Sequence, residues 1–297
     1  MIKSSTIHLS IAGALMKTHV WTPMTVAMCI ALCLGTGGAA PVMISPKEPS
    51  DNPAFTCSVA DAPIHYARVN GVRLAYREFG SGDPLLVIVG FGATMEQVNE
   101  TALALFSSKY HVFLYDHRGM GESDRGHDTP TLPLYAHDAA ELIAALGYQR
   151  MHIYGTSMGS FIAQELALTY PERVQNIILD SSSYSIRLPE TQELLRYVES
   201  VVSDPTSPPG LCDEAQALLA WNGTWDRLAN IQKDVMLVVG TADTITPDIL
   251  SVRMAEQIKG SWLVRFKDLP HAGGDVDPIR YGKTALYFLE MTAGDGI

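Results

Sequence analysis

One stretch, Met151–Gly159, constrains the fold of this chain more than any other. An apolar run that ends at Tyr154 has the pattern of a buried strand, and the sequence Gly-Thr-Ser-Met-Gly completes the stretch. Apolar residues at helical spacing follow directly. A serine between two glycines at a strand-to-helix turn is typical of a nucleophile elbow, in which a strained turn exposes the serine hydroxyl. We therefore predict that Ser157 is a nucleophile; the structural alternative is a serine that only caps a helix.

Strand and helix patterns alternate on both sides of this stretch. Further strands are indicated by apolar runs at residues 85–89, 111–116, 174–179, 234–240 and 262–266. An alternating pattern around Asn70-Gly71 predicts a hairpin ahead of them. This order predicts an α/β fold whose sheet is mainly parallel and is covered by helices on both faces.

Composition divides the chain into four parts. Residues 1–40 combine a basic start, an apolar run and small residues, as in a secretory signal peptide; an uncleaved N-terminal anchor is the alternative. Residues 41–60 are rich in Pro, Ser and Asp and indicate a linker. The core is expected at 61–183 and 226–297, with residues 184–225 inserted as a small helical lid over the carboxyl edge of the sheet. The leader predicts a secreted or periplasmic protein.

Three shorter segments carry more specific expectations. In the lid, helices are expected at 190–202 and 213–221, separated by a Pro-rich break at 204–210. A further helix is expected at 96–106. Cleavage near residue 40 would leave Cys57 and Cys212, which an oxidising compartment would allow to pair.

Charge and motifs exclude several classes of partner. The chain has 21 basic and 32 acidic residues, and its net charge of −11 disfavours nucleic acid and anionic membranes. It has no His-Glu-x-x-His or paired Cys-x-x-Cys motif, and the loop Gly90-Phe91-Gly92 lacks the downstream acid of a dinucleotide fingerprint. We expect no metal, no cofactor and no nucleic acid. The expected partner is a small ester-like substrate, with membrane contact only through an uncleaved N-terminal segment.

Two further residues complete a catalytic constellation with Ser157. Asp243 and His271 each follow a predicted strand, so both are expected at the same edge of the sheet as the serine. A histidine can accept the serine proton near neutral pH, and an aspartate can fix its tautomer. Asp180, which also ends a strand, is the alternative acid.

Backbone N–H groups are the expected donors to an oxyanion. We assign them to Phe91, in a glycine-rich loop after a strand, and to Met158, directly after the serine. A second polar loop contains Asp116, His117 and Arg118. For these three residues we favour a structural role over a catalytic one, because their side chains can tie turns together.

The combination of motifs resembles the α/β-hydrolase superfamily over roughly residues 65–295. The likeness rests on the Gly-Phe-Gly loop, Asp-His-Arg-Gly-Met-Gly-Glu-Ser, Gly-Thr-Ser-Met-Gly, Gly-Thr-Ala-Asp and Pro-His-Ala. Within the superfamily the chain looks like the group of small esterases, lactonases and cofactor-free haloperoxidases or perhydrolases. Many relatives have His-Gly at the oxyanion loop, where this chain has Val89-Gly90.

The function implied is an exported serine hydrolase of carboxylic esters or lactones that works through an acyl-enzyme. Two alternatives stay open. One is a perhydrolase-like, haloperoxidase-like or amide-cleaving enzyme with the same triad. The other is a ligand-binding protein that keeps the hydrolase fold with little turnover.

Overall fold

The computed structural model describes residues 58–292. The predicted leader at 1–40, nearly all of the linker and Cys57 lie outside the described residues, so these expectations and the Cys57–Cys212 pairing stay predictions. Among residues 58–292, no helix has the length and apolar character needed to cross a membrane.

The centre of the fold is an eight-stranded sheet in the order β1-β2-β4-β3-β5-β6-β7-β8. Its strands are β1 (His65–Val69), β2 (Val72–Phe79), β3 (Asp83–Ile88), β4 (Tyr110–Tyr115), β5 (Met151–Thr156), β6 (Val174–Asp180), β7 (Val235–Gly240) and β8 (Trp262–Phe266). The β1–β2 and β2–β4 pairs are antiparallel, and all other neighbouring pairs are parallel. The predicted mainly parallel sheet is thereby confirmed, and the residues that follow its parallel strands meet at one edge.

The hairpin predicted at Asn70-Gly71 joins β1 to β2. Val69 pairs with Val72, and the two turn residues have φ values of 43° and 77°. A two-residue loop with positive φ at both positions matches the twist of the flanking strands.

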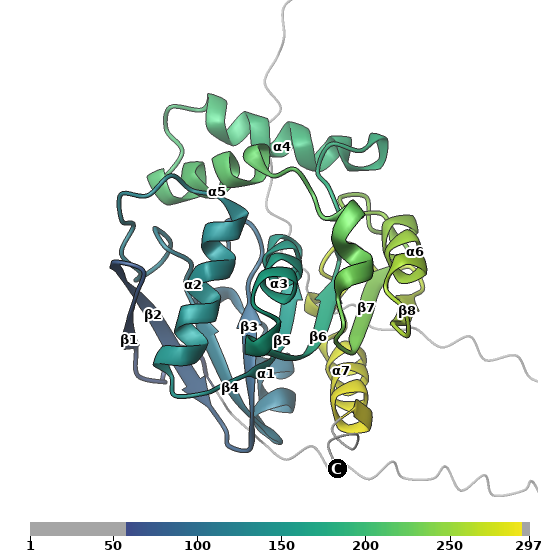
Figure 1. Cartoon of the computed structure of the whole chain (residues 1–297), viewed down its shortest axis with the longest axis horizontal. Coiled ribbons are helices and arrows are strands. Elements are labelled where there is room, and N and C mark those ends of the chain that lie inside the picture. Colours follow the sequence, from purple (N-terminus) through teal and green to yellow (C-terminus); the bar gives the residue numbers. More distant parts are fainter. Residues whose placement is uncertain (1–57, 293–297) are drawn as a thin grey trace, which may run out of the picture. The chain divides into compact units, whose positions relative to one another are not determined.

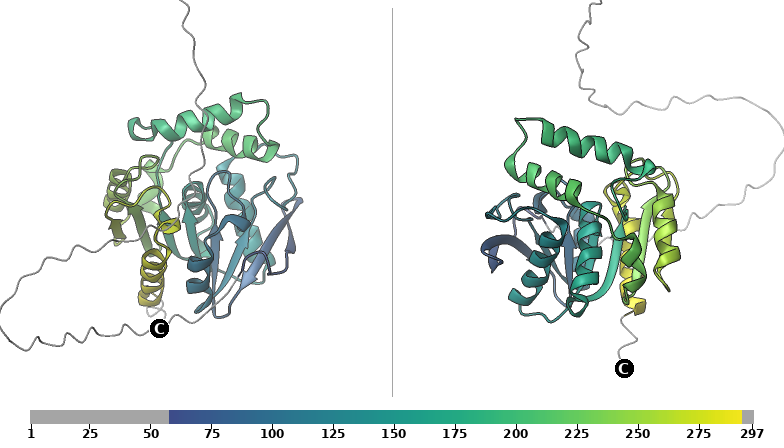
Figure 2. Two further views of the ribbon diagram at one scale, coloured as in Figure 1. Left: turned by 180° about the vertical axis from the view of Figure 1, so that it is seen from behind. Right: turned by 45° about the horizontal axis from the view of Figure 1, so that its top comes forward.

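Helices cover both faces of the sheet (Figures 1 and 2). One face carries α2 (Leu132–Ala145), α3 (Met158–Thr169) and α6 (Asp248–Gln257), and the other carries α1 (Glu100–Ser107) and α7 (Pro278–Thr292). Short 3-10 helices are η1 (Met95–Gln97), η2 (Pro171–Arg173), η3 (Pro189–Thr191), η4 (Trp225–Asn230) and η5 (Gly273–Asp275). Each face has its own apolar cluster, as expected for a sheet buried on both sides.

The segment between β6 and β7 holds two more helices, α4 (Gln192–Ser203) and α5 (Pro209–Ala220). Both lie over one end of the sheet, at the top of Figure 1. The expectation that 204–210 is entirely a break is wrong, because α5 begins at Pro209. Proline is favoured in the first turn of a helix, where its missing N–H would have no intrahelical partner.

The single helix expected at 96–106 is also wrong. The segment begins with η1, and the α-helix starts only at Glu100. The Asn99 side chain accepts hydrogen bonds from the N–H groups of Thr101 (3.0 Å) and Ala102 (3.3 Å). This N-cap starts a new helix after η1, because it satisfies two N–H groups that have no partner within the helix.

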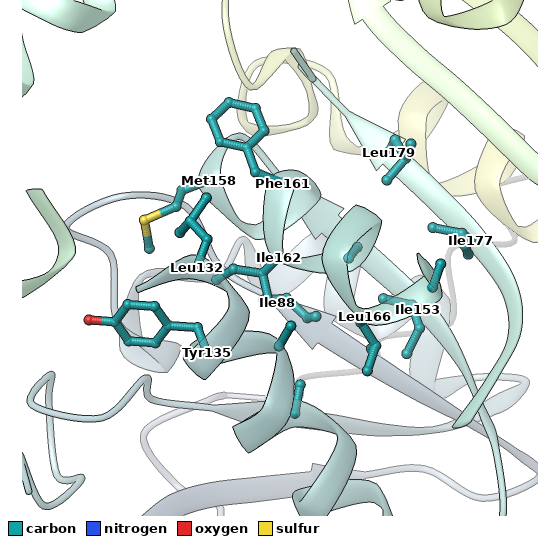
Figure 3. Close-up of a cluster of buried hydrophobic side chains, with 14 of the residues drawn as sticks. Ile88, Leu132, Tyr135, Ile153, Met158, Phe161, Ile162, Leu166, Ile177 and Leu179 are labelled. Atoms are coloured by element: carbon teal, nitrogen blue, oxygen red, sulfur yellow. The ribbon is translucent and has the colours of Figure 1, made fainter. Parts of the chain in front are cut away.

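Helix α3 is fixed by apolar packing along its length. Figure 3 shows Met158, Phe161, Ile162 and Leu166 of this helix beside Leu132 and Tyr135 of α2, and all six side chains are buried. Burial of this face holds the start of α3, and therefore Ser157, in place against the sheet.

Candidate active site

Ser157 occupies a strained turn between β5 and α3. Its φ of 53° and ψ of −120° lie in a region that non-glycine residues rarely adopt. The two flanking glycines are needed for close packing. A Cβ on Gly155 would lie 2.4 Å from the carbonyl oxygen of Gly159, and one on Gly159 would lie 2.1 Å from that of Ile88. The turn is therefore fixed by contacts between backbone segments.

His271 lies between Ser157 and Asp243. Its Nε2 is 2.9 Å from Ser157 Oγ, and its Nδ1 is 2.8 Å from Asp243 Oδ2. The three residues come from the segments after β5, β7 and β8, which the parallel sheet brings to one edge. The structure thus brings together the serine, histidine and aspartate that were singled out in the sequence.

The Asp243 carboxylate is completely buried, and several hydrogen-bond donors surround it. Its Oδ1 accepts hydrogen bonds from the N–H groups of Ile245 (2.9 Å) and Thr246 (2.8 Å). The Thr246 hydroxyl is 3.0 Å from Asp243 Oδ2 and 3.2 Å from His271 Nδ1. Thr246 was missed in the sequence, because a single threonine in a loop carries no motif or periodic signal. Its hydrogen bonds orient the carboxylate that faces the imidazole.

The end of β6 anchors both the serine turn and the histidine loop. Ser157 N–H donates to the Asp180 carbonyl oxygen at 2.9 Å, and Ala272 N–H donates to Ser181 Oγ at 3.0 Å. Because Ala272 follows His271, these two bonds set the relative positions of the serine and the imidazole.

The alternative acid, Asp180, has other partners. Tyr154 Oη donates to its Oδ2 at 2.9 Å, and Ser181 Oγ donates to its Oδ1 at 3.0 Å. Burial raises the pKa of the Asp180 carboxyl to about 7. The hydrogen-bond partner of His271 is Asp243, so Asp180 does not occupy the position of the orienting acid.

The loop expected to supply an oxyanion donor lies beside the serine. A Cβ on Gly90 would be 3.3 Å from Ser157 Cβ. Within the described part of the chain, neither the Phe91 N–H nor the Met158 N–H donates to another backbone group, so both are free of backbone acceptors. Met158 is the first residue of α3, where N–H groups have no intrahelical acceptor and the helix dipole favours negative charge.

Both helices of the segment inserted between β6 and β7, α4 and α5, contact this glycine-rich loop. The rings of Phe91 and Tyr197 of α4 meet edge to face, with centroids 5.6 Å apart. Gly92 N–H donates to Glu214 Oε2 of α5 at 2.7 Å. The other oxygen of Glu214 is 2.8 Å from His117 Nδ1, and both side chains are completely buried. Glu214 was missed because nothing in the sequence connects it to residues so far away.

The remaining residues of the polar loop after β4 have the structural role that we favoured. The Asp116 carboxylate accepts hydrogen bonds from the N–H groups of Met95 (2.8 Å) and Glu122 (2.9 Å). The buried guanidinium of Arg118 donates to Asp138, with an Nη2 to Oδ1 distance of 2.6 Å. Asp116 thus ties the polar loop to η1, and Arg118 ties it to α2.

A cavity of about 130 Å³ adjoins the site on the α1–α7 face. Its lining includes Gly90, Thr156 and Ala272, the chain neighbours of Phe91, Ser157 and His271. Apolar side chains such as Leu103 and Phe106 make up much of the rest. Within residues 58–292, no group of three or more His, Cys, Asp or Glu side chains is arranged to hold a metal ion.

Comparison with known proteins agrees with this fold. The sequence model of a family described as the alpha/beta hydrolase fold matches residues 83–200. The chain belongs to the α/β-hydrolase superfamily. Its eight-stranded, mostly parallel sheet with helices on both faces is the fold of that superfamily.

Relatives of this α/β hydrolase include several kinds of enzyme. A putative carbamate hydrolase of Azorhizobium caulinodans is 26% identical over 75% of this chain and 97% of its own length. A putative non-heme bromoperoxidase of Mycobacterium tuberculosis is 34% identical over 36% of this chain and 41% of its own. A solved thermophilic esterase from Thermogutta terrifontis has a TM-score of 0.70 and 22% identity over 78% of this chain and 99% of its own, a likeness of fold.

Proposed function

We propose that this α/β hydrolase cleaves carboxylic esters or lactones through an acyl-enzyme formed on Ser157. The observation that carries the proposal is the continuous line of hydrogen bonds from Asp243 through His271 to Ser157, at 2.8 and 2.9 Å. Both distances are those of hydrogen bonds, and the one between Ser157 Oγ and His271 Nε2 allows the serine proton to pass to the imidazole.

In the first half of the reaction, Ser157 Oγ attacks the carbonyl carbon while its proton passes to His271 Nε2. Asp243 accepts the Nδ1–H hydrogen bond, which keeps the tautomer correct and stabilises the imidazolium. The carbonyl oxygen becomes an oxyanion, stabilised by the N–H groups of Phe91 and Met158, each worth roughly 3 kcal/mol. As the C–O bond to the leaving group breaks, His271 gives its proton to the departing oxygen.

In the second half, water attacks the acyl-enzyme and His271 accepts its proton. The tetrahedral intermediate then collapses, Ser157 leaves and recovers its proton from His271, and the carboxylic acid is released. In a lactone the leaving oxygen stays attached to the acyl group, so one hydroxy acid is formed.

The cavity beside the site supports a small acyl group. Its volume of about 130 Å³ accommodates a short chain, and its apolar lining favours an uncharged one. In a series of p-nitrophenyl esters from acetate to laurate, we expect kcat/KM to be highest for the short acyl chains.

A carbamate is the second candidate for the acyl group. It is favoured by the relative named as a putative carbamate hydrolase, which is aligned over 97% of its length. A carbamate would use the same serine and the same oxyanion donors. The substrate panel therefore includes a p-nitrophenyl carbamate beside the esters and a set of lactones.

A fluorophosphonate probe tests the central claim. The wild type should be labelled covalently, whereas Ser157→Ala should keep its fold and lose labelling. His271→Ala and Asp243→Asn should lower kcat by about 10³-fold or more, because the proton acceptor or its tautomer is lost. Unchanged ester hydrolysis by Ser157→Ala would refute the assignment. A folded wild type that neither reacts nor turns over any substrate would instead favour a ligand-binding protein.

We also propose that residues 1–40 direct export, on the basis of their composition. Mass spectrometry of the protein from a periplasmic or culture fraction should find an N-terminus near residue 41. Recovery of the full chain in the membrane fraction would favour the anchor.

A further inference from the structure

The buried carboxylate of Glu214 is a charged group that the proposed mechanism does not use. It lies in the lid helix α5, its side chain has no solvent exposure, and its two oxygens point to two different core segments. One accepts from Gly92 N–H at 2.7 Å, and the other from His117 Nδ1 at 2.8 Å. Burial of a carboxylate without hydrogen-bond donors strongly destabilises a fold, so these two hydrogen bonds are needed for Glu214 to be buried here.

The first contact is at the loop that would bind the oxyanion. Gly92 follows Phe91 directly, so the orientation of the Phe91 N–H depends on the same short backbone segment. The φ of Gly92 is 74°, and a Cβ there would lie 3.1 Å from Leu211 Cδ1, also in α5. The loop is therefore in contact with α5 through both a polar and an apolar group.

The second contact ties the same carboxylate to the core. His117 follows β4, and its ring packs against those of Tyr115 and Tyr135, with centroids 5.4 and 5.5 Å away. This packing fixes the imidazole, which in turn fixes Glu214 Oε1 and leaves Oε2 aimed at Gly92. Helix α5, the glycine-rich loop and the end of β4 thus share one hydrogen-bonded junction.

We propose that Glu214 is a positioning residue that couples seating of the lid helix α5 to assembly of the oxyanion hole. The inference rests on the proposed function, because it assigns Phe91 N–H to the oxyanion. When α5 is seated, Glu214 holds Gly92 and thereby aims the Phe91 N–H at the reacting carbonyl oxygen. When α5 lifts, Gly92 loses its acceptor and the oxyanion loses one of its two fixed donors.

The chain offers a matched control in the adjacent residue of α5. Asp213 forms a two-pronged ion pair with Arg125, with an Oδ1 to Nη2 distance of 2.8 Å. This pair also joins α5 to the core, but it does not reach the glycine-rich loop. Because the Arg125 side chain of this ion pair is exposed to solvent, the pair stabilises little, and Asp213→Asn should leave α5 seated and the Glu214–Gly92 hydrogen bond in place.

The experiment compares three variants, Glu214→Ala, Glu214→Gln and Asp213→Asn, with the wild type. Each is measured by steady-state kinetics and by inhibition with an alkyl boronic acid. The boronic acid forms an adduct on Ser157 that mimics the tetrahedral oxyanion. For Glu214→Ala we expect kcat to fall about 10- to 100-fold and boronic acid affinity to fall in parallel, with KM within about threefold. Glu214→Gln keeps a carbonyl acceptor for Gly92 and should stay within about threefold of wild type, as should Asp213→Asn. If Glu214→Ala does not fold, Glu214→Asp replaces it, since the shorter carboxylate cannot reach both donors.

Hydrogen exchange supplies a readout that needs no activity. The Gly92 amide should exchange at least about tenfold faster in Glu214→Ala than in the wild type, while amides of the serine turn at 155–159 stay unchanged. The inference would be overturned if Glu214→Ala kept the wild-type exchange rate of the Gly92 amide and the wild-type affinity for the boronic acid. It would also be overturned if Asp213→Asn lost as much kcat and boronic acid affinity as Glu214→Ala. A wild type that does not react with the fluorophosphonate probe would refute the proposed function, whereas the Gly92 amide would still report on the junction.

Discussion

The two loops that would supply the oxyanion donors are held in place in different ways. The serine turn at 155–159 is fixed by backbone contacts between neighbouring segments, with Gly159 against the carbonyl of Ile88 and Ser157 N–H on the carbonyl of Asp180. The glycine-rich loop at 90–92 is held by a side chain of the inserted helix α5, Glu214. One loop is thus part of the sheet, and the other depends on an insertion.

This difference indicates which part of the site can change without unfolding the protein. Moving the serine turn requires strand β5 and helix α3 to separate, and α3 is buried along most of its length. Moving the glycine-rich loop breaks its contacts with the inserted helices α4 and α5 and leaves the sheet intact. The site therefore holds the proposed nucleophile, Ser157, rigidly, while the position of one proposed oxyanion donor, the Phe91 N–H, can change.

The largest effect is expected from Gly159→Ala, which tests the backbone contact. The new Cβ would meet the Ile88 carbonyl oxygen at 2.1 Å, so α3 would have to move away from β3. We expect a loss of about 3 kcal/mol or more in the free energy of unfolding, measured by urea denaturation. Gly274→Ala is the control, because its Cβ would have an ordinary contact of 3.4 Å with the Tyr281 ring. Equal stability of the two variants would contradict the comparison.

A smaller effect on stability, with a clear effect on rate, is expected from Gly90→Ala. Its Cβ would lie 3.3 Å from Ser157 Cβ and 3.9 Å from Ser157 Oγ, where a shift of a few tenths of an ångström relieves the contact. The variant should fold with a loss of about 1 kcal/mol, and its kcat should fall about tenfold because the serine and the reacting carbonyl are displaced. Unfolding as severe as that of Gly159→Ala would show that the two loops are equally rigid.

The smallest effect on activity is expected from Asp180→Asn. The serine turn uses the backbone carbonyl of Asp180, which this substitution keeps, so kcat should stay within about threefold of wild type. A loss comparable to that of Asp243→Asn would instead identify Asp180 as the acid of the triad.

The same variant has a signature in the pH dependence of stability. The folded pKa of Asp180 is raised to about 7 from its ordinary value of 3.8, so between these values the folded state keeps a proton that the unfolded state releases. This carboxyl therefore stabilises the fold fully below about pH 4, and that contribution is lost as the pH rises to about 7. In urea denaturation across this range, the wild type should lose up to about 1.4 kcal/mol per pH unit relative to Asp180→Asn. Parallel curves would show that burial does not perturb this group.

Local patterns predicted the sheet and most of its connections, because buried strands, a tight hairpin and a Gly-x-Ser-x-Gly turn each have a signature within a few residues. These local patterns predicted the wrong helix boundary where a single residue decided where a helix starts. Asn99 starts a new helix after a 3-10 turn, and Pro209 opens a helix inside a segment that composition marked as a break. In both places capping chemistry outweighed the average composition of the segment.

The sequence by itself determined the strands, most of the helices, their order and the residue types that meet at the carboxyl edge of the sheet, because parallel strands place the residues that follow them at that edge. Only the tertiary structure decided which acid faces His271, since Asp180 ends β6, Asp243 lies in the loop after β7, and both are near the same edge of the sheet. It alone also joined Glu214 to Gly92 and His117, because a hydrogen bond between residues far apart in the chain leaves no pattern in either segment.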